Sequence, residues 1–287
     1  MTLRFAALGD SITVGMGDPR AGGGWRGFAA LLAEGAGAPG QVEFRNFARA
    51  GALSADVMTD QLPRARLWHP HVATMLVGVN DSLRGSFDIA AISDRQHRII
   101  TELCDAGTQV VTACLPEPGR MLGLPQSLAR PLARRIRALN EVIHALAERY
   151  PVAHAHVAHD PLLWDCRMWS VDRLHPSEYG HRRLARLCYD ALAEAGWPMS
   201  RPPGLEPHNR SPSRRAQAWW IATKGTRWVL DRSTDLLPQL MMLAAAEWRL
   251  ARRGLSGHLD LRMTSELQAA LAAVGLASEP EGSAHAG

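Results

Sequence analysis

The sequence predicts a three-layer α/β fold in which a doubly wound sheet of five parallel strands lies between helices. The chain has 287 residues, 46% of them hydrophobic and 21% charged, which is typical of a globular protein whose core needs no disulfide or metal. Over about the first 196 residues, β-favouring apolar runs alternate with segments of helical periodicity. Because crossover helices join consecutive parallel strands, this alternation favours a parallel sheet.

The predicted elements alternate in order along the chain. Short apolar runs predict strands at residues 3–8, 42–47, 72–77, 109–115 and 152–157. Apolar residues at helical spacing predict helices at residues 26–34, 54–66, 89–105, 131–149 and 176–195. Pro176 suits the first turn of the last helix, and Gly196 suits its C-terminal cap.

The composition changes near residue 197, which ends the predicted α/β domain of residues 1–197. The following stretch, 198–215, is rich in proline and arginine and has the composition of a linker. Signals in residues 216–277 are helical, and we expect a helical extension there. The last residues, 278–287, are predicted to form a disordered tail.

The extension carries two apolar stripes at helical spacing, and each stripe needs a surface to pack against. The first stripe consists of Ala218, Ile221, Ala222, Gly225 and Val229. The second stripe consists of Leu237, Leu240, Met241, Ala244, Trp248 and Ala251. Ser265 and Gln268 have the spacing of a capping box, which predicts a helix start. We expect packing on the α/β domain or on a second copy, and favour it over a membrane surface because the second stripe lacks a basic polar face.

Charge and motif content argue against a nucleic-acid partner. Lys and Arg number 32 against 28 Asp and Glu, and much of the excess lies in the predicted linker. No RNP, zinc-finger or helix-turn-helix signature accompanies it, so no nucleic acid is expected. The cysteines form no C-x-x-C pair, which predicts free, buried thiols at Cys104, Cys114, Cys166 and Cys188.

The sequence shows no targeting or membrane-spanning signal. Its N-terminus enters a strand-like run at once, without the charged start, apolar stretch and cleavage site of a signal peptide. Its longest apolar run, 240–246, is far shorter than the ~20 residues that span a bilayer. We therefore expect a cytoplasmic protein.

Polar segments follow the predicted strands at the sheet edge where open α/β sheets bind ligands. All parallel strands point the same way, so these segments converge on one edge. Acyl transfer needs a nucleophile, a base, a group that orients the base and an oxyanion site, and each has a candidate there. The segments are Gly9-Asp10-Ser11, residues 46–51, residues 78–81 and residues 172–175.

These four segments, in this order, resemble the motif blocks of GDSL-type esterases of the SGNH hydrolase superfamily. A weaker further block is represented by Val111 and Pro116 at the end of the fourth predicted strand. The resemblance covers residues 3 to about 196, roughly two thirds of the chain. It implies a flavodoxin-like sheet and an esterase activity.

The resemblance also implies a role for each matching residue. Ser11 would be the nucleophile, His175 the general base and later acid, and Asp172 the group that orients the imidazole. The oxyanion donors would be the backbone N–H groups of Ser11 and Gly51 and the side-chain amide of Asn80. Independently, Asp172 and His175 are three residues apart in a turn, which lets the carboxylate meet one ring nitrogen while the other faces the serine.

Several neighbouring polar residues are better explained as structural. Asp10 is assigned a supporting role, because it can hold its loop by hydrogen bonds to backbone N–H groups. Asn46 can form a turn, and Asp81 can brace its loop. His181 lies within the last predicted helix, where we expect a structural histidine and no second base.

The sequence is expected to bind no metal and to need no cofactor. Two His-x-His pairs, His69/His71 and His154/His156, each place both rings on one strand face, as a metal site requires. No third ligand at a useful spacing accompanies either pair. We therefore predict that the protein binds no metal.

The combined prediction is a serine ester hydrolase that acts on a small-molecule ester through an acyl-serine. An acyltransferase using the same acyl-enzyme, or a non-catalytic binding module on this scaffold, are the alternatives. The substrate is left open. Five apolar residues before Asp172 line an acyl pocket or pack on the last helix: Leu162, Leu163, Trp164, Met168 and Trp169.

Overall fold

The computed structural model describes residues 2–209 and 237–277, together with positions 213, 215, 218, 219 and 223. Within these residues, all sheet pairings are parallel and the strand order is β2-β1-β3-β4-β5. The strands are β1 (Leu3–Gly9), β2 (Val42–Asn46), β3 (Val72–Leu76), β4 (Gln109–Ala113) and β5 (Ala153–Ala155). This flavodoxin-like order confirms the predicted fold class.

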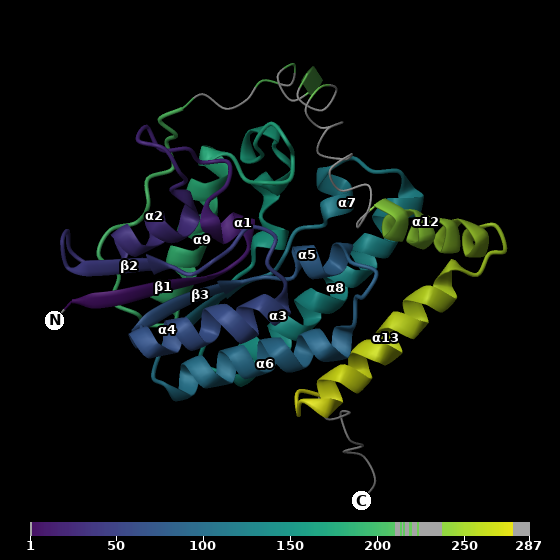
Figure 1. Ribbon diagram of the computed structural model, residues 1–287, viewed down its shortest axis with the longest axis horizontal. Coiled ribbons are helices and arrows are strands. Elements are labelled where there is room, and N and C mark those ends of the chain that lie inside the picture. Colours follow the sequence, from purple (N-terminus) through teal and green to yellow (C-terminus); the bar gives the residue numbers. More distant parts are fainter. Residues whose placement is uncertain are drawn as a thin grey trace, which may run out of the picture.

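Helices cover both faces of the sheet (Figure 1). One face packs against α2 (Gly27–Gly35) and α9 (Glu178–Glu194), where Phe28 and Leu184 join a core with Phe5 of β1. The other face packs against α4 (Leu62–Trp68), α6 (Ile89–Asp105) and α8 (Gln126–Arg149), and its core includes Leu8. Four shorter helices lie in the segments that follow β1, β2, β3 and β4: α1 (Ser11–Val14), α3 (Ser54–Asp56), α5 (Val79–Leu83) and α7 (Pro118–Met121). Short 3₁₀ turns occur at Val157–His159, Pro161–Trp164 and Cys166–Met168.

The helix predicted at 54–66 is divided by a π-helical turn, Val57–Gln61, between α3 and α4. This wider turn carries the buried Gln61 to the end of β1. Its side-chain Oε1 accepts a hydrogen bond from Gly9 N at 2.8 Å, and its Nε2 donates one to Gly9 O at 2.9 Å. Such turns are typical of functional regions, and this one fixes the backbone that precedes Ser11.

Two predicted helix starts are wrong. Helix α8 begins at Gln126, upstream of Pro131, because Leu128 and Ala129 already donate backbone hydrogen bonds to Pro125 O. Helix α9 begins after Pro176, with Ser177 as its N-cap, whose Oγ accepts from Gly180 N.

The helical extension contains α12 (Leu237–Ala251) and α13 (Ser256–Ala273), which lie against α8 and α6 (Figure 1). Helix α13 buries Leu267, Ala270 and Leu271 in the same core as α6. Ser265 lies inside α13, so the capping box predicted there is wrong. The N-cap of this helix is Leu255, whose carbonyl oxygen accepts a hydrogen bond from His258 N. No helix in the described part of the chain has the length and apolarity needed to cross a bilayer.

The described members of the second predicted stripe do not form the packed face of α12; the side chains of Leu237 and Leu240 lie outside the described part. Met241 is 63% exposed and Trp248 53% exposed, whereas Glu247 is only 1% exposed. The physical reason is an ion pair: Arg134 of α8 lies 3.2 Å from Glu247, which turns the acidic side of α12 inward. Most of the first stripe and the predicted tail, 278–287, lie outside the described residues.

Candidate active site

Ser11 follows the end of β1 as the first residue of α1. Gly9 has a φ of 150°, and a Cβ there would overlap the carbonyl oxygen of Leu76, so this close strand-to-helix turn requires glycine. Asp10 caps the helix, because its Oδ1 accepts a hydrogen bond from Ile12 N at 3.0 Å. The local sequence therefore places Ser11 at the carboxyl edge of the sheet.

A chain of hydrogen bonds connects Ser11, His175 and Asp172. His175 Nε2 lies 2.9 Å from Ser11 Oγ, and His175 Nδ1 lies 2.7 Å from Asp172 Oδ2. Asp172 Oδ1 accepts hydrogen bonds from the backbone N–H groups of Leu174 and His175 and from the Ser170 hydroxyl. These bonds fix the carboxylate, which in turn fixes the imidazole toward the serine.

The electrostatics keep Asp172 ionised. Burial alone would raise the pKa of this carboxyl, but its hydrogen bonds and its attraction to His175 outweigh burial and lower the pKa to about 2. A charged Asp172 beside Nδ1 favours the tautomer whose Nε2 can take the serine proton.

The three predicted oxyanion donors lie on loops that contact one another. Asn80 Nδ2 lies 3.2 Å from Ala52 O, beside Gly51, and 3.4 Å from Asp10 Oδ2, beside Ser11. Gly51 has a φ of 78°, and a Cβ there would meet no atom within 4 Å. The glycine faces open space, which lets a substrate approach its backbone closely.

Residues 7–183 match the GDSL-like lipase/acylhydrolase family. The chain belongs to this family. No curated protein matches the chain. Among solved structures, a catalytic mutant of Axe2, an acetylxylan esterase from Geobacillus stearothermophilus, shares 18% identity with a TM-score of 0.53, covering 70% of this chain and 98% of that one.

Two further structures have the same fold. That of TesA shares 22% identity with a TM-score of 0.54 and covers 67% of this chain and 99% of that one. A putative GDSL-like lipase from Parabacteroides merdae shares 18% identity with a TM-score of 0.53 and covers 67% and 96%. Membership in the GDSL-like family assigns the chain to the carboxylic ester hydrolases.

The polar neighbours of this GDSL-like site have the structural contacts expected of them. Asn46 Nδ2 donates to Thr13 O at 2.7 Å, and its Oδ1 accepts from Ala48 N in a turn. Asp81 is buried and accepts from both the backbone and the hydroxyl of Ser54. These contacts tie together the loops after the first three strands.

His181 is a structural residue. Its Nε2 lies 2.9 Å from Met16 O, and its Nδ1 accepts from Phe28 N at 3.2 Å. Burial lowers the pKa of His181 to about 4, so the ring is neutral at pH 7. Because both ring nitrogens make hydrogen bonds to backbone groups, His181 joins the Ser11 loop, α2 and α9.

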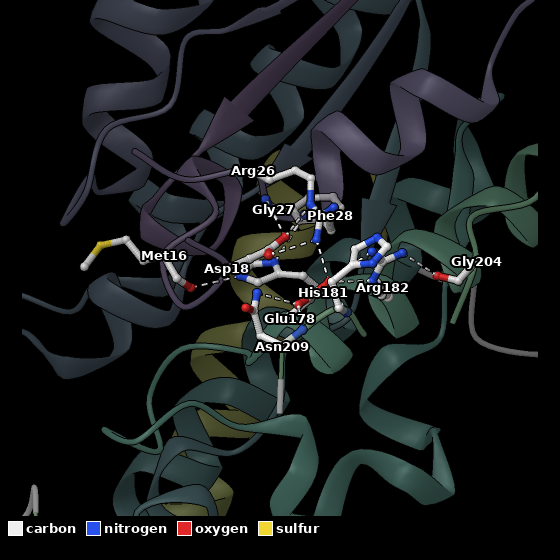
Figure 2. Close-up of polar contacts among 11 residues, drawn as sticks. Met16, Asp18, Arg26, Gly27, Phe28, Glu178, His181, Arg182, Gly204 and Asn209 are labelled. Carbon is white, nitrogen blue, oxygen red and sulfur yellow. Dashed lines mark hydrogen bonds and ion pairs between the residues drawn. The ribbon is translucent and has the colours of Figure 1, made fainter. Parts of the chain in front are cut away.

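A buried ionic network beside the site was not predicted (Figure 2). Arg26 bridges Asp18 at 3.0 Å and Glu178 at 2.8 Å. Glu178 also accepts from the backbone N–H groups of His208 and Asn209. No spacing rule joins these residues, since Arg26 and Glu178 are 152 positions apart. A glutamate in the first turn of a helix is the sole sequence signal, and it is a common one.

The apolar segment before Asp172 divides between core and surface. Leu163, Met168 and Trp169 are buried in the core shared with α9, and Trp169 Nε1 donates to Leu163 O. Trp164 is 37% exposed, and the Arg120 guanidinium lies 3.6 Å from its ring centroid. Most of this segment therefore supports the catalytic loop instead of lining a pocket.

Proposed function

We propose that the protein is a serine ester hydrolase that acts through an acyl-serine intermediate, with Ser11, His175 and Asp172 as its triad. The observation that carries this proposal is the continuous hydrogen-bond chain from Asp172 through His175 to the Ser11 hydroxyl. The order of the groups matches that needed for a serine nucleophile with a histidine base.

In the first half of the reaction, Ser11 Oγ attacks the ester carbonyl carbon while its proton passes to His175 Nε2. The resulting oxyanion accepts hydrogen bonds from Ser11 N, Gly51 N and Asn80 Nδ2. Collapse of this intermediate breaks the bond to the alcohol oxygen, which takes the proton from His175. The products are the free alcohol and the acyl-serine.

In the second half, His175 takes a proton from water, whose oxygen attacks the acyl carbon. The acyl–Oγ bond breaks, and the proton returns to Ser11 Oγ as the carboxylic acid leaves. Asp172 stays ionised throughout and stabilises the imidazolium formed in each half. The proposed cycle uses the groups of this chain and water.

A fluorophosphonate probe tests the proposal, because only an activated serine reacts with it rapidly. We expect one labelled site in the wild-type protein and none in Ser11→Ala, together with loss of p-nitrophenyl acetate hydrolysis. The exposed Ser86 provides a matched control, and Ser86→Ala should label and hydrolyse like the wild type. Unchanged hydrolysis by folded Ser11→Ala would refute the assignment.

A further inference from the structure

A second cluster of reactive side chains lies on the outer edge of the sheet. Cys114 follows β4, His154 lies in β5, His156 directly follows it, and His144 comes from α8. One ligand atom from each lies within 4.8 Å of those of the other three. The edge strand β5 is three strand positions from β1, about 14 Å, so this cluster is separate from the Ser11 site.

Two imidazole nitrogens in the cluster are buried without a partner. His154 Nδ1 lies 2.9 Å from the Thr112 hydroxyl, which leaves Nε2 to face the remaining groups. Within the residues that the structure describes, neither His154 Nε2 nor His144 Nε2 has a hydrogen-bond partner. A buried polar atom without a partner is costly, so these nitrogens point to a ligand that would satisfy them.

The rings are packed together, which is unfavourable for charged imidazoles. The centroids of His154 and His156 are 4.8 Å apart, and those of His154 and His144 are 4.9 Å apart. Burial, followed by the neighbouring histidines His144, His156 and His159, lowers the pKa of His154 to about 4. Such close packing favours neutral rings, which can offer lone pairs to an ion.

The thiol of Cys114 lies in surroundings suited to a metal-bound thiolate. Its Sγ is buried and accepts a hydrogen bond from Ala158 N at 3.1 Å. The pKa of the free thiol is raised, because burial outweighs the hydrogen bonds from the backbone N–H groups around Ala158. A coordinated metal ion removes the thiol proton, and the N–H donor then stabilises the resulting charge.

We propose that Cys114, His144, His154 and His156 bind one divalent transition-metal ion of the borderline-soft class, of which Zn²⁺ is the test case. One sulfur and three imidazole nitrogens match the donor set and the number of ligands of a closed tetrahedral site. Such a site has ligand atoms about 3.3–3.7 Å apart, so small side-chain rotations would close this cluster around an ion. Binding forms an S–metal bond, releases the thiol proton to solvent and changes no oxidation state.

The proposed role of the ion is structural. It would join β4, the three-residue strand β5 and α8 at the β5 edge of the described sheet. The chain leaves β5 through His156 and leads directly to the segment that carries Asp172 and His175. A metal at this point would anchor the beginning of that segment.

Metal titration of the full-length, tag-free protein tests the proposal, after chelator treatment and dialysis. We expect one equivalent of Co²⁺ to give tetrahedral d–d absorption and a thiolate-to-metal charge-transfer band, and one equivalent of Zn²⁺ to displace it and raise the Tm. Cys114→Ser should lose the charge-transfer band. His156 is exposed, so it can be changed with little effect on folding. His156→Ala should weaken metal binding by more than the about 10- to 100-fold that is typical of losing a hydrogen-bond partner of a metal ligand.

Matched controls separate this site from surface binding. Cys104→Ser and His258→Ala change a thiol and an exposed histidine outside the cluster, and both should titrate like the wild type.

Thr112→Val keeps all four ligands but removes the contact to His154 Nδ1, and should weaken Zn²⁺ binding about 10- to 100-fold. Absence of binding by the wild type, or binding that folded Cys114→Ser and His156→Ala retain in full, would overturn the proposal.

Discussion

Two carboxyl groups beside Ser11 have pKa shifts of opposite sign. The contacts of Asp172 with His175 outweigh its burial and lower its pKa to about 2. Burial raises the pKa of Asp10 to about 6, because its backbone hydrogen bonds, chiefly the one from Ile12 N, and the attraction of His175 offset only part of the desolvation. Near neutral pH, Asp172 is thus fully charged, whereas Asp10 is close to its titration point.

The raised pKa of Asp10 predicts a pH-dependent penalty on stability. Below pH about 4 this carboxyl is protonated in both the folded and the unfolded chain; as the pH rises through about 6, the folded state must charge a buried group. We expect Asp10→Asn to remove this penalty, so that its free energy of unfolding rises relative to wild type by up to about 3 kcal/mol between pH 4 and 7. Urea unfolding across this range measures it.

The exposed Asp94 is the control, since Asp94→Asn should follow the wild-type curve at every pH. If the Asp10→Asn and wild-type curves also run parallel, Asp10 has an ordinary pKa in the folded protein.

At the level of residues, the sequence predicted those site members that immediately follow a strand or precede a helix. Ser11 and His175 come together as expected, because parallel strands bring their ends to one edge. Gln61 and His144 could not be predicted, since each acts through contacts with residues of a different element that no local pattern encodes. For the same reason, the sequence showed no third ligand beside the His154/His156 pair. Cys114 and His144 lie next to that pair only in the folded structure.

Among the elements, the start of α9 is stabilised by charged and polar contacts to Glu178. Glu178 in its first turn receives hydrogen bonds from Arg182 of α9 itself and from two other parts of the chain, which supply Arg26 and the neighbouring residues His208 and Asn209 (Figure 2). Burial alone would raise the pKa of Glu178, but these donors lower it to about 2. The carboxylate therefore stabilises the fold above pH about 4.5.

We expect Glu178→Gln to lower the free energy of unfolding at pH 7 by about 3 to 5 kcal/mol, as loss of one partner from a buried ion pair does. The difference from wild type should shrink as the pH falls from 4.5 toward 2, where the wild-type carboxylate also loses its charge. Urea unfolding at pH 7 and pH 3 measures both effects. The exposed Arg262–Glu266 pair supplies the control, and Glu266→Gln should change stability by less than about 1 kcal/mol. An equal loss in the two variants would mean that the network adds nothing beyond a surface pair.

Strands were predicted more reliably than helix ends, for a physical reason. A strand buried on both faces, such as β3, is apolar except for Thr74 and is visible in the sequence. A helix start depends on which group caps it, and caps are made by turns and tertiary contacts. Pro131 therefore looked like a start although the turn around Pro125 begins α8 earlier, and Ser265 looked like a cap although it lies inside α13.

Over the whole molecule, the alternation of strands and helices was sufficient to predict the sheet, but not how the C-terminal helices attach to it. Helix α12 turns Glu247 toward Arg134 and leaves Met241 and Trp248 exposed. Periodicity identifies an apolar stripe but contains no information about a buried ion pair at the border of that stripe. The attachment thus combines this pair, a second pair between Arg134 and Asp260 at 2.7 Å, and the apolar face of α13.

The apolar contact of α13 can be broken without touching the Ser11 site. Leu271 is 7% exposed and packs in the core shared with α6, so Leu271→Asp would bury a charge there and should release α13 from the domain. We expect limited proteolysis to cleave residues 237–277 rapidly in this variant, while fluorophosphonate labelling of Ser11 stays within about twofold of wild type. Leu261→Asp is the matched control on the same helix, because Leu261 is 70% exposed and its change should alter neither measurement. Loss of labelling in Leu271→Asp alone would instead show that the docked helices hold the catalytic loops in place.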